Sequence, residues 1–310
     1  MSLSTISLLA IELVLRGGRV MDPETGLDAV RNVGIEGGTI VAITEEPLEG
    51  TVIVDASGLV VAPGFIDLHA HGQDPVSNRL QAQDGVTTAL EMEIGVYPVG
   101  AWLASREGKA VIHYGGTVGH LPARAKLFHD IDVGSWALGD DADANRQRLM
   151  KLSDYAYKAT NTDELQKLEA LMVRGLEEGG LGFGLGITYT PGATREEILS
   201  LFEVARTQHV PIYVHLRGEG SGGTLGAFQE CIANAAATGA SLHIVHMNSS
   251  AGDLGRTTLS MIRGARRRSR RHHRGLPLHR WLHAPRIRAL RLLGGSARRG
   301  FPESTMAIDR

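Results

Sequence analysis

The spacing of apolar and polar positions changes near residue 60 of the chain. Before that point, short alternating apolar runs are separated by glycine pairs, which is typical of strands joined by hairpin turns. Turns are expected at Gly17-Gly18 and Gly37-Gly38. The predicted strands are residues 11–15, 33–36, 39–43 and 51–55. Residues 1–60 are therefore predicted to form a small β-domain.

After residue 60, apolar runs alternate with amphipathic helical stretches, which predicts alternating strands and helices and a parallel sheet. The six predicted strands are residues 65–69, 86–93, 110–117, 181–189, 210–215 and 241–247. Because side chains suited to ligand binding fall at the strand ends, a barrel is favoured over an open sheet. Six strands do not close a (β/α)₈ barrel. The predicted fold class is α/β, with an incomplete (β/α)₈ TIM-like barrel over residues 61–265.

The helical pattern is clearest at residues 163–178 and 195–206. Thr162 is the expected N-cap of the first of these helices, because its hydroxyl can accept a hydrogen bond from the first turn. Thr194 and Glu197 have the spacing of a capping box at the start of the second. Both helices would cover the predicted sheet.

Two further segments have a predicted role. Residues 125–161 are expected to form an insertion over the mouth of the barrel, with a polar loop at 139–143. The single cysteine, Cys231, lies in an alanine-rich helical pattern at 225–237, so it is expected to be a core residue rather than a nucleophile. One cysteine excludes an internal disulfide framework and fits a reducing compartment.

Four histidines stand at the ends of predicted strands. His69 and His71 alternate, so their side chains face the same way and can bind one cation. His215 and His246 end the fifth and sixth strands. Strand ends of a barrel surround one mouth, so these side chains predict a metal centre. Zn²⁺ is the expected metal, as one or two ions, with another divalent transition metal as the alternative. The polar residues after His71, Gln73 first, are expected to lead into solvent.

The second strand carries Glu91 and Glu93 at alternate positions of an apolar run. Burying either carboxylate without a partner would cost several kcal/mol, and a neighbouring cation removes that cost. Both are therefore candidate metal ligands. Glu93 is preferred because it lies nearer the strand end. The alternative is an ion pair with a residue such as Arg124.

Residues 62–71, which include Gly-Phe-Ile-Asp-Leu-His-Ala-His, resemble the metal-binding signature of the amidohydrolase superfamily. Further segments follow in the order and rough spacing of its N-acyl-D-amino-acid deacylase (D-aminoacylase) branch. They are residues 85–88, 119–120 with Arg124, 186–192, 214–217 and 244–246. The resemblance covers about residues 10 to 263. It implies a metal-dependent hydrolase that cleaves a non-peptide C–N bond, specifically by deacylating an N-acyl-D-amino acid, and an N-terminal β-sandwich.

The resemblance also suggests roles for single residues. Tyr189 resembles the tyrosine that helps to polarise the scissile carbonyl, and a phenol there can hydrogen-bond a developing oxyanion. Arg217 would face the same mouth and can pair with a substrate carboxylate. These two are the candidate catalytic residues, with a structural role as the alternative for each. His120 and Arg124 are weaker candidates. The branch has a cysteine ligand near Ile94, and its replacement here suggests a carboxylate-bridged or carboxylate-liganded variant.

Charge is divided very unevenly along the chain. The net charge is −2, yet residues 261–310 carry fourteen arginines against two acidic residues, a local charge of +12. Three explanations remain open for residues 266–310: a nucleic-acid-binding extension, a disordered solvated tail, or a shifted reading frame. The frameshift is favoured because the wrong frame of a GC-rich gene is rich in Arg, Ala, Gly, Pro and His. The last two strands and the aspartate base of the superfamily would then be missing, so impaired activity of this truncated chain is expected.

No segment has the roughly 18 apolar residues of a membrane span, and the first residues make a poor signal peptide. A cytoplasmic protein without a membrane partner is therefore predicted. Its expected partner is a small N-acylated amino acid, nucleic acid is not expected, and the sequence makes no prediction of subunit number. Two other functions stay open. One is a dihydroorotase-like or hydantoinase-like cyclic amidase, against which the lack of an evident strand-borne lysine counts. The other is a non-catalytic protein whose arginine-rich tail binds nucleic acid.

Overall fold

The protein is described by a computed structural model that covers residues 11–135, 147, 151–218 and 223–272, with the backbone alone from 266 onward. The chain forms two compact units, one ending at Phe65 and the other beginning at Ile66. Most of the expected tail at 266–310 lies outside the described residues. No described helix is both long enough and apolar enough to span a membrane.

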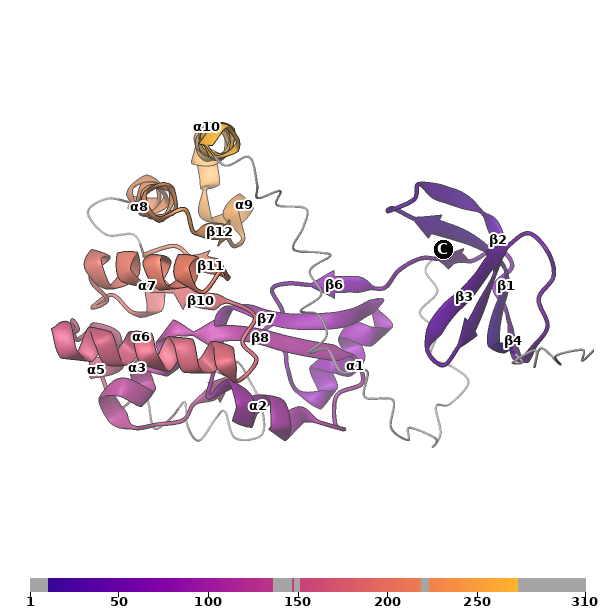
Figure 1. Ribbon diagram of the computed structural model, residues 1–310, viewed down its shortest axis with the longest axis horizontal. Coiled ribbons are helices and arrows are strands. Elements are labelled where there is room, and N and C mark those ends of the chain that lie inside the picture. The colour runs from indigo at the N-terminus through magenta and orange to yellow at the C-terminus, as the bar shows by residue number, and fades with distance from the viewer. Residues whose placement is uncertain (1–10, 136–146, 148–150, 219–222, 273–310) are drawn as a thin grey trace, which may run out of the picture. The chain divides into compact units, whose positions relative to one another are not determined.

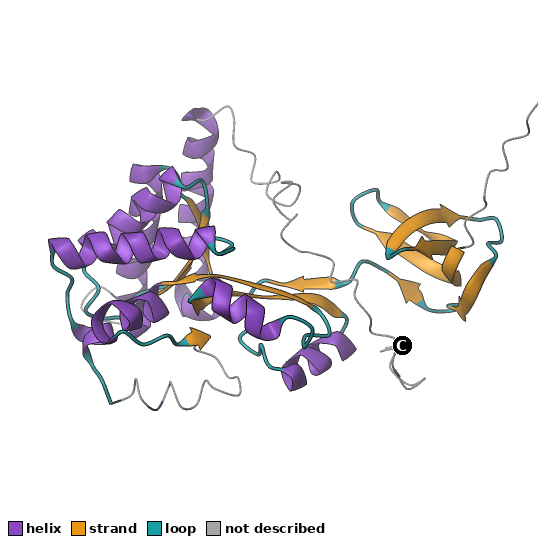
Figure 2. Cartoon of the chain, turned by 60° about the horizontal axis from the view of Figure 1, so that its bottom comes forward, coloured by secondary structure: helices purple, strands orange, loops and turns teal. Residues whose placement is uncertain are grey.

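The first unit is a single mixed sheet. Its strands are β1 (Ile11–Asp22), β2 (Leu27–Glu36), β3 (Thr39–Thr44), β4 (Gly50–Asp55) and β5 (Val60–Val61). They run in the order β3-β2-β1-β4, with β5 also paired to β1. Figure 2 shows this unit as strands and loops without helices. The described strands all belong to one sheet, so the expected sandwich stays a prediction.

The two glycine pairs of this unit behave differently. Gly37 and Gly38 both have positive φ, +53° and +73°, and form the predicted tight turn between β2 and β3. Two successive positive φ values suit a hairpin turn of this kind. Gly17 and Gly18 were predicted as a turn, and this is wrong. Strand β1 continues through them, and its pairing with β2 shifts register between Leu15 and Gly18. A bulge absorbs the extra residue without ending the strand.

The second unit is built on a seven-stranded sheet. Its strands are β6 (Phe65–Asp67), β7 (Val86–Tyr97), β8 (His113–Gly119), β9 (Gly134–Ser135), β10 (Phe183–Gly186), β11 (Pro211–His215) and β12 (Ser241–Ile244). The order is β12-β11-β10-β8-β7-β6, and β9 pairs antiparallel with β7. Neighbours from β7 to β12 along this path are parallel. The sheet curls into a half-barrel (Figure 1), which confirms the predicted α/β class.

Helices follow most of the strands. They are α1 (Pro75–Gln83), α2 (Val99–Arg106), α3 (His120–His129), α5 (Asp154–Tyr157), α6 (Thr162–Glu177), α7 (Arg195–Thr207), α8 (Gly223–Thr238), α9 (Met247–Ser250) and α10 (Gly255–His272), with short 3₁₀ turns η1 (Ile187–Tyr189) and η2 (Gly252–Leu254). The six predicted strands are all present, although several are shorter than expected. The run at 181–189, for example, is a strand only to Gly186 and then turns into η1.

The main core lies between the sheet and helices α6, α7 and α8. Fully buried side chains of the strands, including Phe183 and Ile212, meet Leu168, Phe202 and Phe228 from the helices. Because side chains alternate along a strand, burying Ile212 and Val214 against the helices turns Tyr213 and His215 to the opposite face. Cys231 of α8 belongs to this core at 1% exposure. Burial raises the pKa of its thiol to about 12, as expected of a packing residue.

Two helix starts differ from the prediction. The N-cap of α6 is Asn161 rather than Thr162, and Asn161 and Glu164 form a reciprocal capping box. The Thr194 hydroxyl accepts a hydrogen bond from the Glu197 amide at 3.0 Å, as predicted for α7. The Glu197 side chain does not bond back to the cap. It turns into the protein toward Arg124, so the predicted capping box is only half formed.

The predicted insertion at 125–161 is described in part. Strand β9 extends the sheet beside β7, and α5 packs on α3. The contact is a small separate apolar core of Leu121, Ala125, Ile131, Val133, Tyr155 and Ala156. The predicted polar loop at 139–143 lies outside the described residues.

Candidate metal centre

The four strand-end histidines lie close together in the second unit. His69 and His71 follow β6, and the backbone of this segment is held to β7 by a hydrogen bond from Ala70 N to Leu90 O at 3.0 Å. His215 is the last residue of β11, and His246 comes two residues after β12. The curl of the sheet brings these ends together around one carboxylate, that of Glu93 on β7.

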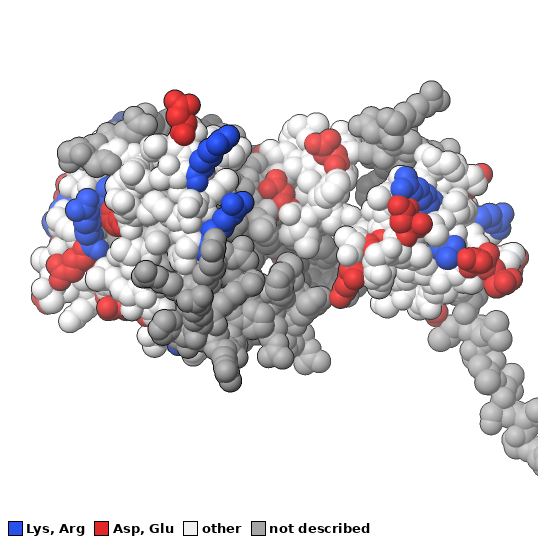
Figure 3. Space-filling model, turned by 90° about the horizontal axis from the view of Figure 1, so that it is seen from above, with Lys and Arg blue, Asp and Glu red and all other residues white. Residues whose placement is uncertain are grey.

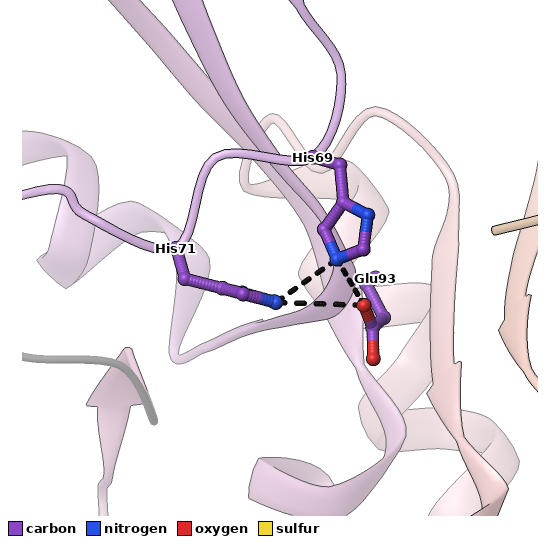
Figure 4. A group of neighbouring side chains, drawn as sticks. All are labelled: His69, His71 and Glu93. Atoms are coloured by element: carbon purple, nitrogen blue, oxygen red, sulfur yellow. Dashed lines mark hydrogen bonds and ion pairs between the residues drawn. The ribbon is translucent and has the colours of Figure 1, made fainter. Parts of the chain in front are cut away.

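The first group of donor atoms, which we call the first subsite, consists of His69, His71 and Glu93. The Nε2 atoms of the two histidines are 3.0 Å apart. His71 Nε2 lies 3.4 Å from Glu93 Oε2, and His69 Nε2 also contacts that oxygen. Figure 4 shows the two rings pointing toward the carboxylate from the loop after β6.

The second subsite consists of Glu93, His215 and His246. His215 Nδ1 lies 2.6 Å from Glu93 Oε1 and 2.9 Å from His246 Nε2. His246 Nε2 is 3.5 Å from Glu93 Oε2. Glu93 is therefore common to both subsites, and one carboxylate faces two pairs of imidazoles.

This donor set fits a divalent transition metal. A tetrahedral Zn²⁺ with bonds of about 2.0–2.1 Å holds its ligand atoms about 3.4 Å apart, and His71 Nε2 lies 3.4 Å from Glu93 Oε2 and 3.0 Å from His69 Nε2. Glu93 is 1% exposed, and its Oε2 atom faces the Nε2 atoms of His69, His71 and His246. A buried carboxylate oxygen in this position is satisfied by a cation. Imidazole and carboxylate are also the ligands that zinc commonly takes.

Glu91 has a different place from Glu93. It is fully buried, and it lies 2.7 Å from Nδ1 of His71, on the side of the ring away from the first subsite. Its other oxygen accepts a hydrogen bond from the Ile94 amide at 3.2 Å. Glu91 belongs to neither donor group, so its geometry favours orienting His71 over binding the metal directly.

The electrostatics of the cluster favour a cation. The hydrogen bond to Glu91, followed by that to Glu93, raises the pKa of His71 to about 10. Burial is the largest influence on Glu93 and opposes its ionisation, but hydrogen bonds from His215, His69 and His71 outweigh it and lower its pKa. Two buried carboxylates thus create a negative potential that a metal ion would neutralise.

His246 is held in an uncommon backbone conformation. Its φ of 32° and ψ of 42° are left-handed, a region that non-glycine residues seldom occupy. The turn directs its Nε2 toward His215, and its Nδ1 lies 2.8 Å from the Ser250 hydroxyl in α9. A second polar contact therefore fixes this ring, as Glu91 fixes His71.

Tyr189 and Arg217, the predicted catalytic residues, are placed differently. Tyr189 is 42% exposed, and its ring centroid lies 5.1 Å from that of His215, beside the second subsite. Arg217 binds Glu230 through two hydrogen bonds of 3.1 and 2.9 Å, and donates to Ala193 O at 2.9 Å. Its guanidinium thus joins the loop after β11 to α8, where the sequence predicted a group available to substrate.

Sequence reasoning missed a buried charge cluster around Glu197. Arg124 donates to both of its oxygens at 2.6 and 2.7 Å, and Thr160 donates to one at 2.8 Å. His120 Nε2 lies 2.7 Å from the same carboxylate. Arg124, suggested as a partner of Glu91 or Glu93, is therefore paired elsewhere. The sequence contains one signal for this cluster. Glu197 lies on the same face of α7 as the buried Leu201, four residues later, so its carboxylate needs a partner inside the protein.

The chain was compared with known protein families, curated proteins and solved structures. No protein-family profile matches the chain. It is 39% identical over 94 residues to the dihydroorotase of Streptococcus pneumoniae, covering 30% of this chain and 22% of that protein. It is 28% identical over 230 residues to the N-acyl-D-glutamate deacylase of Alcaligenes xylosoxydans xylosoxydans, covering 68% of this chain and 44% of that one.

A solved structure shares the fold. It is the N-acyl-D-glutamate deacylase of Bordetella bronchiseptica complexed with zinc and a phosphonate inhibitor, with a TM-score of 0.64 and 24% identity. The match covers 84% of this chain and 56% of that chain. The chain spans less than half the length of the two curated relatives above. The relatives that this chain resembles thus include a dihydroorotase and an N-acyl-D-glutamate deacylase.

Proposed function

We propose that the second unit carries the metal centre of a hydrolase that cleaves a non-peptide C–N bond. The observation that carries this proposal is the buried Glu93 carboxylate shared by two imidazole pairs. Such a donor set has no role in packing and matches the needs of one or two divalent ions. The deacylase and dihydroorotase relatives act on bonds of this class.

The residues of the chain divide the work of the site. A divalent cation, when bound, lowers the pKa of water and polarises a carbonyl oxygen. Glu93 and the four histidines would hold it, while Glu91 and Ser250 fix the rings of His71 and His246. Burial, followed by the charge of Glu93, raises the pKa of the Tyr189 phenol, so it stays protonated near neutral pH and can donate a hydrogen bond to a developing oxyanion.

Deacylation of an N-acyl-D-amino acid is the reaction we favour. Motifs at residues 186–192 and 244–246 support it, as does similarity to a deacylase over 68% of the chain. Hydrolysis of a cyclic amide is the second candidate, supported by the dihydroorotase relatives. A strand-borne lysine would favour the cyclic amidase, and no lysine lies on a strand in the described part of the chain. In this chain the residue common to both subsites is Glu93.

Arg217 is assigned to holding its loop rather than to binding substrate. Its guanidinium would have to exchange Glu230, which is itself largely buried, for a substrate carboxylate. A bidentate pair of this kind is specific in geometry and costly to break. Recognition of a substrate carboxylate is therefore left to other groups at the mouth.

We also propose that the sheet of the first unit is one half of a sandwich. Apolar side chains such as Val30, Ile40 and Val52 are 63%, 59% and 52% exposed on it. A sheet with this much uncovered apolar surface is completed by a second layer in sandwich folds.

A nucleic-acid-binding function has less support. Its sequence signal is the arginine-rich tail, which is described only as far as residue 272. On the face drawn in Figure 3, the described basic side chains are scattered among acidic and uncharged ones. Nucleic-acid binding uses a continuous basic surface.

The proposal is tested first by metal content and then by chemistry. The purified full chain, loaded with Zn²⁺, should bind up to two ions, and His69→Ala and His246→Ala should each remove one. A panel of N-acyl-D-amino acids, hydantoins and dihydroorotate then separates the two reactions. Absence of stoichiometric zinc from the wild-type chain would refute the metal centre. Ring opening without deacylation would select the cyclic amidase.

A further inference from the structure

A line of polar side chains runs beneath the loop that carries His71. Arg106 Nη2 donates to Asn78 Oδ1 at 2.9 Å, and Asn78 Nδ2 donates to Gln81 Oε1 at 3.0 Å. Gln81 Nε2 then donates to the carbonyl of Gly72 at 3.2 Å. Three hydrogen bonds thus connect the end of α2, through two residues of α1, to the residue next to His71. We call this set the amide relay.

The chemistry of its two ends fixes the direction of the relay. A guanidinium can only donate and a carbonyl can only accept, so each amide has one workable orientation between them. Asn78 must present its oxygen to Arg106, and Gln81 must present its nitrogen to Gly72. All three bonds therefore point the same way, and the charge at the head polarises the bonds that follow.

The head of the relay is held rigidly. The Arg106 guanidinium lies 5.3 Å from the ring centroid of Trp102 and 5.0 Å from that of Tyr114. Tyr114 is fixed in turn by a hydrogen bond from its hydroxyl to Leu103 O at 3.1 Å. Asn78 is fully buried. A cation in contact with two aromatic rings, next to a buried amide, gives the relay an anchor outside the metal site.

The other end of the relay has little freedom. A Cβ atom on Gly72 would lie 2.8 Å from the Cβ of Ser77, so the loop backbone already touches α1. Gln73 was expected to lead into solvent, which is wrong. It is 1% exposed, and its Nε2 donates to Ala70 O at 2.8 Å. Glu91 fixes the ring of His71 and β7 holds the backbone at Ala70, so α1 adds the contact on the other side of His71, at Gly72.

We propose that Asn78 and Gln81 are positioning residues of the first subsite, acting through the Gly72 carbonyl on the His71 backbone. The inference rests on the proposed metal centre. Outer partners of metal ligands contribute roughly 10–100-fold to metal affinity. Loss of the relay should weaken Zn²⁺ binding at the first subsite by about that factor and leave the second subsite, whose histidines come from β11 and the turn after β12, unchanged.

The test uses the full chain and Zn²⁺ alone. Gln81→Met removes the donor to Gly72 at nearly constant volume. Asn78→Asp keeps the acceptor for Arg106 and removes the donor to Gln81. Gln83→Met, on the exposed side of the same helix, is the matched control. Competition with a chromophoric chelator gives the two zinc dissociation constants. They are assigned to subsites by the one lost in His69→Ala and the one lost in His246→Ala.

A second readout needs no metal. Amide hydrogen exchange of the peptide containing residues 69–73 should be faster in both relay variants of the metal-free protein, and unchanged in Gln83→Met. Circular dichroism identifies a variant that fails to fold, in which case the other relay variant decides.

The outcomes separate the relay from the metal centre. Weaker zinc binding at the first subsite alone, with faster exchange, supports the relay. Two unchanged dissociation constants in a folded relay variant overturn it. If the wild-type chain binds no zinc, the proposed function fails, and the exchange data alone then decide whether the relay positions the loop.

Discussion

Two clusters in the second unit combine a buried glutamate with imidazole, and they differ in what balances the charge. Glu197 accepts hydrogen bonds from Arg124 and Thr160 and lies beside His120, and the side chains of Glu197, Arg124 and His120 are fully buried. Glu93 meets four imidazoles that are partly exposed, and no Lys or Arg pairs with it in the described part of the chain.

The difference separates a structural cluster from a site. An arginine is a permanent cation, so the Glu197 cluster is complete within the chain. An imidazole that binds a metal is neutral and gives up a lone pair, so with its four histidines acting as ligands the Glu93 cluster is completed by a cation from outside. The presence of glutamate and histidine alone would not distinguish the two clusters.

The largest expected effect comes from Glu93→Gln. Both subsites use this carboxylate, so zinc affinity should fall at both, by more than the roughly 100-fold upper range for loss of an outer partner. Metal analysis after gel filtration measures this, with Glu203→Gln on the exposed side of α7 as the control. Retention of two zinc ions by Glu93→Gln would show that Glu93 is not needed for metal binding, and the Glu93 cluster would then no longer differ from the Glu197 cluster in this respect.

Glu197→Gln should have the opposite profile. It leaves the Arg124 cation buried without a countercharge, which costs about 3–5 kcal/mol of folding free energy. Urea unfolding should show this loss, while zinc stoichiometry stays at the wild-type value. A variant of wild-type stability that had lost its zinc would show that Glu197 serves the metal.

Lowering the pH should weaken the Glu197 cluster in the wild-type protein and so reduce its free energy of unfolding. Burial opposes ionisation of Glu197, but His120 and Arg124 together lower its pKa to about 2, from an ordinary 4.5. The unfolded chain therefore binds this proton more readily, so the stabilisation is complete above about pH 4.5 and is lost as the pH falls toward about 2. Unfolding free energies from pH 6 to 3 should fall more steeply for wild type than for Glu197→Gln, and parallel curves would contradict this.

The smallest effect is expected from Glu91→Gln, which changes the orientation of one ligand. Zinc affinity at the first subsite should fall by about 10–100-fold, with the second subsite unaffected. Chelator competition measures both constants. A loss at both subsites as large as that of Glu93→Gln would make Glu91 a direct ligand instead.

Much of the fold was predictable because its signals are local. Alternation of strand and helix placed all six strands, and strand ends indicated where His215 and His246 would lie. The N-cap of α6 was harder to predict, because Asn161 and Thr162 are adjacent and both residue types can cap a helix. The reciprocal hydrogen bonds between Asn161 and Glu164 make Asn161 the cap.

The misses come from partners that are distant in sequence. Glu197 was explained by a capping box, which hid its pairing with Arg124, 73 residues away. Arg217 was read from the strand alone, whereas Glu230 on the next helix takes its guanidinium. Gln73 follows a strand end, yet it is buried, and its amide nitrogen donates hydrogen bonds to carbonyls of the loop and of β7. The polarity of a side chain predicts that it needs hydrogen-bond partners. Only the fold shows whether those partners are water molecules or other groups of the protein.

The buried Cys231 thiol makes the second unit able to report its own opening. It is the only cysteine of the chain, faces the core from α8, and has a thiol pKa raised by burial. A thiol reagent can modify it only while that helix is detached from the sheet. The labelling rate of the wild-type protein therefore measures how often α8 separates from the sheet, and a slower rate with Zn²⁺ would show that the metal makes this opening rarer.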